Sequence, residues 1–211
     1  MAQTPVFVVL DGIDGCGKST QAGLLVKTLA AQRECEPLHL REPGSTPLGE
    51  RIRALLLSRE IEIEPPSEAL LFAAARRAML DQLVAPALAA GRDVICERFH
   101  ASTFAYQSIA GGLDEQQVLG MLRTWAGSPA PDLTVILDLE ARDARLRRAA
   151  PTDRIEDRGL AFQEAVGRGY RRYAQLDTRT QLIDAHASPE VIAARILALV
   201  KARLAGDERR G

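Results

Sequence analysis

The feature that most constrains this chain is a run at residues 12–19 that reads Gly-Ile-Asp-Gly-Cys-Gly-Lys-Ser. It fits the pattern GxxxxGK[ST], and it lies between an apolar run at 6–10 and a stretch at 20–33 with apolar residues at helical spacing. The glycines of this pattern let successive backbone N–H groups turn inward, and the loop opens onto a helix N-terminus that carries about half a positive charge. The run therefore predicts a strand, a phosphate-binding loop and a helix in succession.

Two side chains of this loop have predicted roles of their own. Lys18 can reach the β- and γ-phosphates of a nucleotide, and the hydroxyl of Ser19 can bind Mg²⁺. Backbone N–H groups would hold further phosphate oxygens. The predicted nucleotide-binding residues are Gly12, Ile13, Asp14, Gly15, Cys16, Gly17, Lys18, Ser19 and Thr20.

Short apolar runs alternate with helical patterns along the rest of the chain. Ser67 is a candidate N-cap of a long helix, and Pro86 is a candidate kink or break in it. Continuous apolar strands that alternate with helices indicate a parallel sheet covered on both faces. The predicted fold is α/β, a P-loop NTP hydrolase fold with a five-stranded parallel sheet in one domain at 1–211. Strands are expected at 6–10, 38–40, 93–96, 133–139 and 181–184, and helices at 20–33, 48–57, 67–90, 113–125, 142–149, 160–177 and 188–204.

Composition narrows the partners and the compartment. The net charge of −1 gives no overall basic field, so we expect neither nucleic acid nor an anionic membrane as a partner. No apolar run reaches the ~20 residues that cross a bilayer, and the first residues lack the basic and apolar regions of a signal peptide. The cysteines Cys16, Cys35 and Cys96 are few and widely spaced, which is typical of reduced thiols. We expect a cytoplasmic protein.

Ligands of parallel sheets bind at the carboxyl ends of the strands. In this chain the residues just after the predicted strands are 12–19, 41–46, 97–107 and those from 140 onward. The phosphate-loop motif alone is shared by kinases, switch GTPases and ATPases. The chain has no NKxD sequence for guanine recognition and no acidic-x-x-Gly switch sequence, which argues against a GTPase.

Four further segments resemble a known family. Residues 41–49, Arg-Glu-Pro-Gly-Ser-Thr-Pro-Leu-Gly, resemble the REPGGTxxG loop of bacterial thymidylate kinases, and residues 68–76 resemble that family's helix with a Phe and an Arg four residues apart. Residues 97–107 resemble its DR[YH]xxSxxAYQ segment, and residues 153–156, Asp-Arg-Ile-Glu, resemble its arginine-bearing lid. The segments follow the family order. The resemblance implies Mg²⁺-dependent transfer of the γ-phosphoryl of ATP to dTMP, giving dTDP and ADP in dTTP synthesis, by a homodimer.

The resemblance also implies a pocket for the base and sugar of dTMP. Phe72 and Arg76 share a helix face, where the ring could stack on a pyrimidine and the guanidinium could donate to a base carbonyl. A core Phe and a surface Arg are the alternative. Gln107 offers a donor and an acceptor to a thymine edge, or it is a solvated polar side chain. Ser102 and Thr103 would line the pocket, or they cap the following helix.

The acceptor phosphate and the metal need charged residues. Arg98 follows a strand end and would hold the monophosphate with its planar fork. Glu97 is a candidate for organising Mg²⁺; the family usually has Asp at this position, and the longer side chain keeps the charge but changes its reach. Arg41 and Arg53 are further candidates for the phosphate, and a solvated helix residue is the alternative for Arg53. Glu42 is a candidate for Mg²⁺ through water. Asp14 resembles the family's acidic residue near the 3′-hydroxyl of the deoxyribose.

A small lid is expected at about 142–158, where six arginines are partly balanced by four acids. A solvated helix with salt bridges is one interpretation of this run. The other is that the lid supplies positive charge near the moving phosphoryl group, because the phosphate loop contains no arginine. Arg154 is the first candidate and Arg148 the second, and lid closure would exclude water.

Two rival functions stay open at this point. Another nucleoside or nucleoside-monophosphate kinase would use the same loop and lid, and only the base pocket argues against it. A non-catalytic nucleotide-binding regulator would not need the intact lysine, serine and lid arginines. For the kinase, the residues expected to act in phosphoryl transfer are Lys18, Arg98, Arg154, Glu97 and Asp14.

Overall fold

The computed structural model describes residues 4–33, 35–147, 154–155 and 158–207. Its centre is a five-stranded sheet in the order β2-β3-β1-β4-β5, and every pair of neighbouring strands is parallel. The prediction of a P-loop-type α/β fold is confirmed. The strands are β1 (Phe7–Asp11), β2 (Leu38–Arg41), β3 (Val94–Glu97), β4 (Leu133–Asp138) and β5 (Thr180–Asp184).

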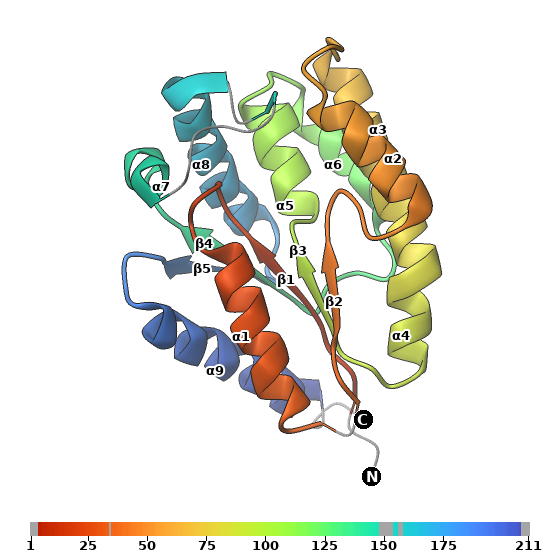
Figure 1. Cartoon of the computed structure of the whole chain (residues 1–211), viewed down its shortest axis with the longest axis vertical. Helices are drawn as coiled ribbons and strands as arrows, with labels where there is room; N and C mark the ends of the chain where they lie inside the picture. Colours follow the sequence, from red (N-terminus) through yellow and green to blue (C-terminus); the bar gives the residue numbers. More distant parts are fainter. Residues whose placement is uncertain (1–3, 34, 148–153, 156–157, 208–211) are drawn as a thin grey trace.

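Helices cover both faces of the sheet (Figure 1). On one face α1 and α9 pack against each other and on the strands, and on the other face α8 packs on β4 and β5. The helical segments are α1 (Lys18–Ala30), α2 (Pro47–Leu57), α3 (Pro65–Met79), the π-helical η1 (Leu80–Val84), α4 (Ala85–Ala89), α5 (His100–Thr103), the π-helical η2 (Phe104–Ile109), α6 (Glu115–Ala126), α7 (Ala141–Arg147), α8 (Gly159–Leu176) and α9 (Pro189–Asp207).

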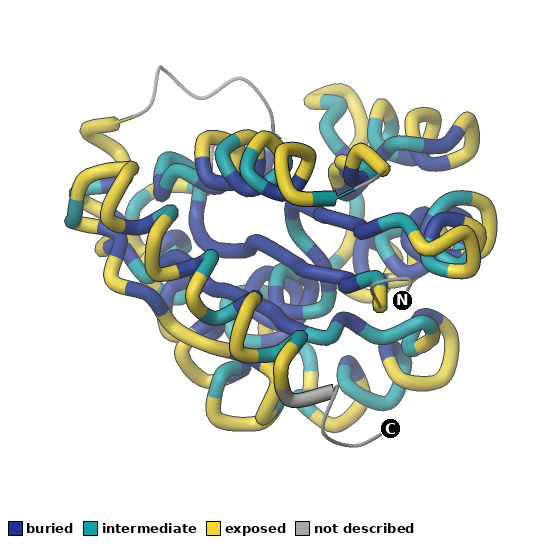
Figure 2. Tube along the Cα trace, turned by 90° about the horizontal axis from the view of Figure 1, so that it is seen from below, coloured by how far each residue is buried: buried dark blue, intermediate teal, exposed yellow. Residues whose placement is uncertain are grey.

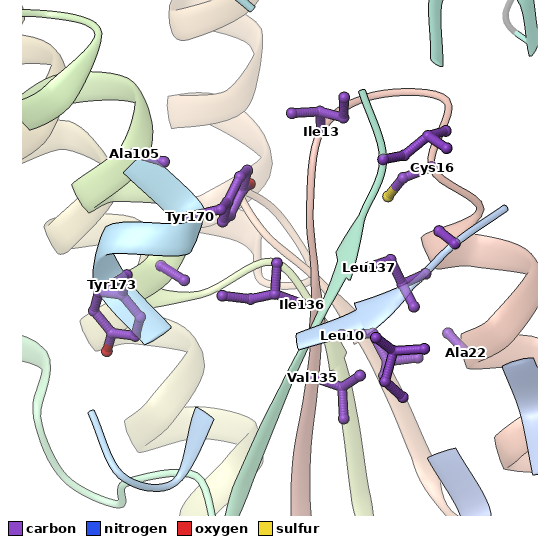
Figure 3. Packing of buried hydrophobic residues seen from close by; sticks show 14 of the residues in the cluster. Leu10, Ile13, Cys16, Ala22, Ala105, Val135, Ile136, Leu137, Tyr170 and Tyr173 are labelled. Atoms are coloured by element: carbon purple, nitrogen blue, oxygen red, sulfur yellow. The ribbon is translucent and has the colours of Figure 1, made fainter. Parts of the chain in front are cut away.

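The central strands β1, β3 and β4 are buried on both faces, which explains their largely apolar sequences, whereas the edge strands β2 and β5 are partly exposed. Figure 2 shows them as a buried layer between helices whose outer faces are exposed. Successive side chains of a strand point to opposite faces. In Figure 3, Val135 and Leu137 lie on the side of Ala22 from α1, whereas Ile136 lies on the side of Tyr170 from α8. Because of this alternation, the position of a residue in its strand decides which face of the sheet its side chain reaches.

The helix expected at 67–90 differs from the prediction in its start and its interior. It begins at Pro65, and its N-cap is Glu64, so the assignment of Ser67 as N-cap was wrong. Proline suits the first helical turn, where its missing N–H has no intrahelical partner to lose. Before Pro86 the chain forms the π-helical turn η1 and then continues as α4. The π turn accommodates a residue that cannot donate to the helical ladder.

Two further differences concern segments near the site. Residues 100–109, which were not predicted as helix, form α5 and η2 directly after β3. The helix expected at 142–149 is α7, of which the structure describes the part up to Arg147. Arg148 and much of the expected lid, residues 148–153 and 156–157, lie outside the described residues.

Candidate active site

The phosphate loop connects the end of β1 to α1, as the motif predicts. Gly15 has a φ of 89°, and a Cβ atom there would lie 2.3 Å from the carbonyl oxygen of Ala144. No other residue fits such an approach, so this glycine brings the loop against α7. Lys18 is buried, and its Nζ donates to the carbonyl oxygens of Gly12 and Ile13, each at 2.9 Å. The ammonium group of Lys18 therefore lies against the backbone of the loop.

The hydroxyl of Ser19, at the start of α1, lies against a carboxylate from the neighbouring strand. Its Oγ donates to Oε2 of Glu97 at 2.5 Å, and Nε2 of His39 lies 3.0 Å from Oε1 of the same carboxylate. Parallel pairing puts the end of β3 beside the ends of β1 and β2, which is why these side chains meet. A hydroxyl and a carboxylate are hard oxygen ligands of the kind that Mg²⁺ takes. The pair fits a magnesium site, and it includes the longer glutamate.

Arg98 stands at the junction between β3 and α5 with a φ of 67°. A left-handed backbone at a non-glycine residue is uncommon and costs about 1–3 kcal/mol, so surrounding contacts must hold it. Its N–H donates to the carbonyl of Leu10 at 2.9 Å, and its guanidinium forms an ion pair with Asp14 and donates to Oγ of Ser102 at 3.2 Å and to the hydroxyl of Tyr170 at 3.3 Å. Arg98 is thus fixed beside the phosphate loop.

Asp14 carries a full negative charge beside this guanidinium. Burial by itself would raise the pKa of Asp14, but the cations of Arg98 and Lys18 lower it, and the net pKa lies well below the ordinary value. The hydroxyl of Tyr106 also donates to its Oδ2 at 3.3 Å. The carboxylate is therefore ready to accept a hydrogen bond from a ligand hydroxyl over the whole physiological pH range.

Asp11, which sequence reasoning did not select, connects the loop to the segment after β3. Its buried Oδ2 accepts from the N–H groups of Phe99 and Ser102 at 3.0 and 3.1 Å, and its Oδ1 accepts from the hydroxyls of Ser102 and Tyr170 at 2.7 and 2.8 Å. Phe99, the N-cap of α5, has no capping side chain of its own. An acidic residue at the end of an apolar strand was the one sequence signal for this anchor.

The first cavity of the site has a volume of about 130 Å³. It brings together eight of the predicted site residues, from five separate segments of the chain. Sequence reasoning missed four of its lining residues, Pro43, Leu57, Tyr106 and Ile155. The predicted residues that line it are Asp14, Glu42, Arg53, Phe72, Arg98, Ser102, Thr103 and Gln107.

Arg76 lies behind this cavity, not on the surface. It is 1 % exposed, and its Nε donates to both carboxylate oxygens of Glu42 at 2.9 and 2.8 Å. Its Nη2 donates to the carbonyl of Phe99 and to Oγ1 of Thr103, both at 3.0 Å, while Nη1 is buried with no partner among the described residues. Burial raises the pKa of Glu42 to about 7, although Arg76 opposes this shift. The two hydrogen bonds from Nε to the carboxylate are the contacts by which Glu42 holds Arg76 in place.

A second cavity, of about 500 Å³, is lined by residues 14, 15 and 17–20 of the phosphate loop and by three predicted arginines, Arg41, Arg53 and Arg98. Its lining also includes Arg147 of α7, whose Nη1 donates to the carbonyl of Ala185 at 2.9 Å and which sequence reasoning did not single out. Four residues line both cavities, namely Asp14, Glu42, Arg53 and Arg98. The two cavities therefore meet at a boundary that carries two arginines.

The described end of the expected lid lies over the first cavity. Arg154 donates to the carbonyl of Leu56 at 3.0 Å and to Oε2 of Glu68 at 2.5 Å, and Arg158 donates to the same Oε2 at 2.7 Å. Between them Ile155 is buried and lines the cavity. In this arrangement the predicted first lid arginine is held by α2 and α3.

Comparisons with known proteins agree with this geometry. A family model described as thymidylate kinase matches residues 10–196. A thymidylate kinase of Synechococcus sp. strain JA-3-3Ab is 42% identical over 203 residues, covering 94% of this chain and 97% of that protein. One of Jannaschia sp. strain CCS1 is 41% identical over 206 residues, covering 95% and 98%.

A solved structure gives the same result in three dimensions. The crystal structure of thymidylate kinase from Ehrlichia chaffeensis aligns with a TM-score of 0.75 at 27% identity, over 93% of this chain and 98% of that one. The family match extends from the phosphate loop into α9. With the motifs, the sheet and both cavities on the same chain, we conclude that this chain belongs to the thymidylate kinase family.

Proposed function

We propose that this chain transfers the γ-phosphoryl of ATP to dTMP with Mg²⁺, giving ADP and dTDP for dTTP synthesis, and that the two joined cavities are its active site. Family membership makes the chain a nucleoside-monophosphate kinase. The observation that carries the proposal is the shared wall: a cavity over the phosphate loop and a cavity beside Phe72 meet at Arg98 and Arg53. Two nucleotides bound from opposite sides would bring their phosphates together there.

On the donor side, the loop backbone and Lys18 would bind the phosphates of ATP. Lys18 would exchange the carbonyls of Gly12 and Ile13 for phosphate oxygens, a stronger, charge-assisted contact. Ser19 and Glu97 would hold Mg²⁺, and His39 orients Glu97 from β2. When bound there, the ion would supply positive charge that neutralises the phosphates of ATP. Glu42, bound to Arg76, would reach this site through water alone.

On the acceptor side, Phe72 would stack on the thymine ring, and Gln107 would contact its polar edge. Arg76 would donate to a base carbonyl through Nη1, its one amino group without a partner among the described residues. Arg98 would hold the monophosphate, with Arg41 and Arg53 adding charge. Ser102 and Thr103 belong to the walls of this pocket, and Asp14 would accept from the 3′-hydroxyl.

The proposed reaction needs positioning and charge neutralisation, and it needs no general base. The attacking atom is an anionic phosphate oxygen, so it needs no deprotonation. Arg98 and Lys18 would lower the repulsion between two anionic phosphates and stabilise the charge that develops during transfer. His100 is a poor candidate for a base, because burial lowers its pKa to about 3 and its ring is stacked on Phe99. The contact of Arg154 with the moving phosphoryl stays a prediction and requires this residue to leave Glu68.

The proposal also covers domain organisation and assembly. We propose a single domain with a small lid, and a cytoplasmic homodimer. Exposed Leu70 on α3 and Trp125 on α6, two helices that pack together, support a subunit contact. Among the helices that the structure describes, none has the length and apolar character that a bilayer crossing needs.

A coupled ADP-release assay with ATP, Mg²⁺ and each of dTMP, dUMP, dCMP, AMP and GMP tests the function. We expect turnover that depends on the acceptor, prefers dTMP and disappears in Lys18→Ala. Preference for another monophosphate would retain the phosphoryl chemistry and refute the base pocket. ATP hydrolysis that is independent of any acceptor would favour a regulator on the same fold.

A further inference from the structure

Glu68 is a fully buried carboxylate that no step above uses. It lies on α3, is 0 % exposed and accepts hydrogen bonds from three side chains. Its Oε2 accepts from Nη2 of Arg154 at 2.5 Å and of Arg158 at 2.7 Å, and its Oε1 accepts from Nε2 of Gln107 at 2.8 Å. Two guanidinium groups thus compensate one buried negative charge, and a neutral amide takes the remaining oxygen.

The amide of Gln107 can turn over, exchanging its oxygen and nitrogen, but this neighbour fixes it. A carboxylate only accepts hydrogen bonds, so the NH₂ group must face Glu68. The carbonyl Oε1 of Gln107 then points away from Glu68. It is buried with no partner among the described residues, and Gln107 lines the first cavity and is 1 % exposed. Burying an acceptor without a partner is costly, so Oε1 is set for a donor supplied by a ligand.

We propose that Glu68 is a positioning residue that sets base specificity by holding the Gln107 amide with its oxygen toward the ligand. This inference rests on the proposed placement of the base in the first cavity. Thymine and uracil carry a donor at N3, whereas N3 of cytosine is an acceptor. An amide oxygen presented to N3 accepts from the first two bases and repels the third. Glu68 discriminates without touching the base.

The two arginines make the consequence of one substitution predictable. In Glu68→Gln the residue gains an NH₂ group. Arg154 and Arg158 offer only donors, so the new amide must turn its oxygen to them, and Arg158 alone imposes this orientation when Arg154 moves to the phosphoryl group. Its NH₂ group then faces Gln107, which has to present its oxygen to residue 68 and its nitrogen to the cavity. The substitution therefore inverts the hydrogen-bonding character of the base pocket with almost no change in shape.

The test measures kcat/KM for dTMP, dUMP and dCMP in the full chain. In Glu68→Gln we expect the ratio of dTMP to dCMP to fall by about 10- to 100-fold. The ratio of dTMP to dUMP should stay unchanged, because both bases have the N3 donor. A purely structural role of Glu68 would lower all three rates together and leave both ratios intact, and that result would overturn the proposal.

Two further variants complete the design. Exposed Glu64, one helical turn earlier and at the N-cap of α3, gives the matched control Glu64→Gln, which should leave both ratios as they are. The exchange Glu68→Gln with Gln107→Glu returns an acceptor to the cavity and should restore the preference for dTMP. This double variant also carries the test if Glu68→Gln does not fold; a folded double variant that prefers dCMP refutes the proposal.

Gln107→Leu separates this inference from the function on which it rests. If Gln107→Leu loses the preference for dTMP over dCMP while Glu68→Gln keeps it, Gln107 reads the base and Glu68 does not orient it. If Gln107→Leu leaves the preference unchanged, the base does not lie against Gln107, and the proposed pocket fails together with the role of Glu68.

Discussion

The buried pair of Arg76 and Glu42 makes the sharpest stability prediction. Arg76 is 1 % exposed and Glu42 is 3 % exposed, and both carboxylate oxygens accept from the guanidinium. Glu42→Leu leaves a buried cation whose remaining acceptors are the uncharged oxygens of Phe99 and Thr103. Breaking a buried pair from one side costs about 3–5 kcal/mol. For a chain of this size that corresponds to a drop in Tm of about 6–20 °C.

The assay is urea unfolding at pH 8, above the pKa of about 7 to which burial raises Glu42, so that the pair is ionised. The double variant Glu42→Leu with Arg76→Met should recover most of the lost free energy of unfolding, because apolar groups can replace a buried ion pair at little cost. Asp81→Asn is the control: Asp81 pairs with Arg77 on the exposed side of the same helical run, and we expect a loss of about 0.3–0.5 kcal/mol.

Activity separates this role from a general packing effect. The double variant should fold and yet lose turnover of dTMP, since the proposed donor to the base carbonyl is gone. The reasoning is refuted if Glu42→Leu loses less than about 1 kcal/mol, which would mean that the Arg76 charge is compensated elsewhere. It is equally refuted if the double variant is as unstable as the sum of the two single variants.

Three further predictions concern pH and the metal. Burial lowers the pKa of His100 to about 3, so between pH 3 and pH 6.5 the unfolded chain binds a proton that the folded chain does not. The contribution of the neutral imidazole to stability is complete above about pH 6.5 and is lost as pH falls. His100→Gln should therefore reduce the slope of the unfolding free energy against pH, below pH 6.5, by up to about 1.4 kcal/mol per pH unit. Hydrogen bonds that the imidazolium of His186 donates to the carboxylates of Asp184 and Asp143 raise the pKa of His186. Its contribution to stability is therefore present below pH 6.5 and disappears as pH rises, and His186→Asn should lower Tm at pH 5.5 but not at pH 9. Glu97→Gln should raise the Mg²⁺ concentration for half-maximal turnover by about tenfold or more, whereas an unchanged Mg²⁺ dependence would remove Glu97 from the metal site.

Local signals predicted the sheet and the phosphate loop well. The strand at 133–139 and the loop at 12–19 depend on residues next to each other, and parallel pairing then places their ends together. The contacts that decide the site are of another kind. Glu42 and Arg76 are 34 positions apart, and Asp11 and Tyr170 are 159 positions apart. A single sequence carries no trace of such pairings. The family resemblance led to the prediction that Arg76 contacts the base, which stays a prediction, and it could not identify the carboxylate that holds Arg76.

The π-helical turns are a second feature that depends on contacts between distant segments, although each turn is short. Pro86 gave a reason to expect a break, but η2 at 104–109 contains neither proline nor glycine. Gly169 of α8 is its neighbour, where an added Cβ would lie 2.6 Å from Cα of Ala105. Close packing of α8 on η2 is therefore a tertiary feature, and it places Gln107 and Tyr106 at the cavity.

Both halves of the site depend on one buried carboxylate in the centre of the sheet. Asp11 ends β1, and so it lies between the loop proposed to bind the donor and the α5 segment proposed to bind the acceptor. It also holds Tyr170, whose hydroxyl accepts from Arg98 at 3.3 Å. Arg98 keeps its left-handed backbone against a carbonyl of the same strand, Leu10. The arginine that joins the two cavities is therefore aligned by β1, and in the proposed function the sheet would set the distance between the two phosphates before either nucleotide arrives.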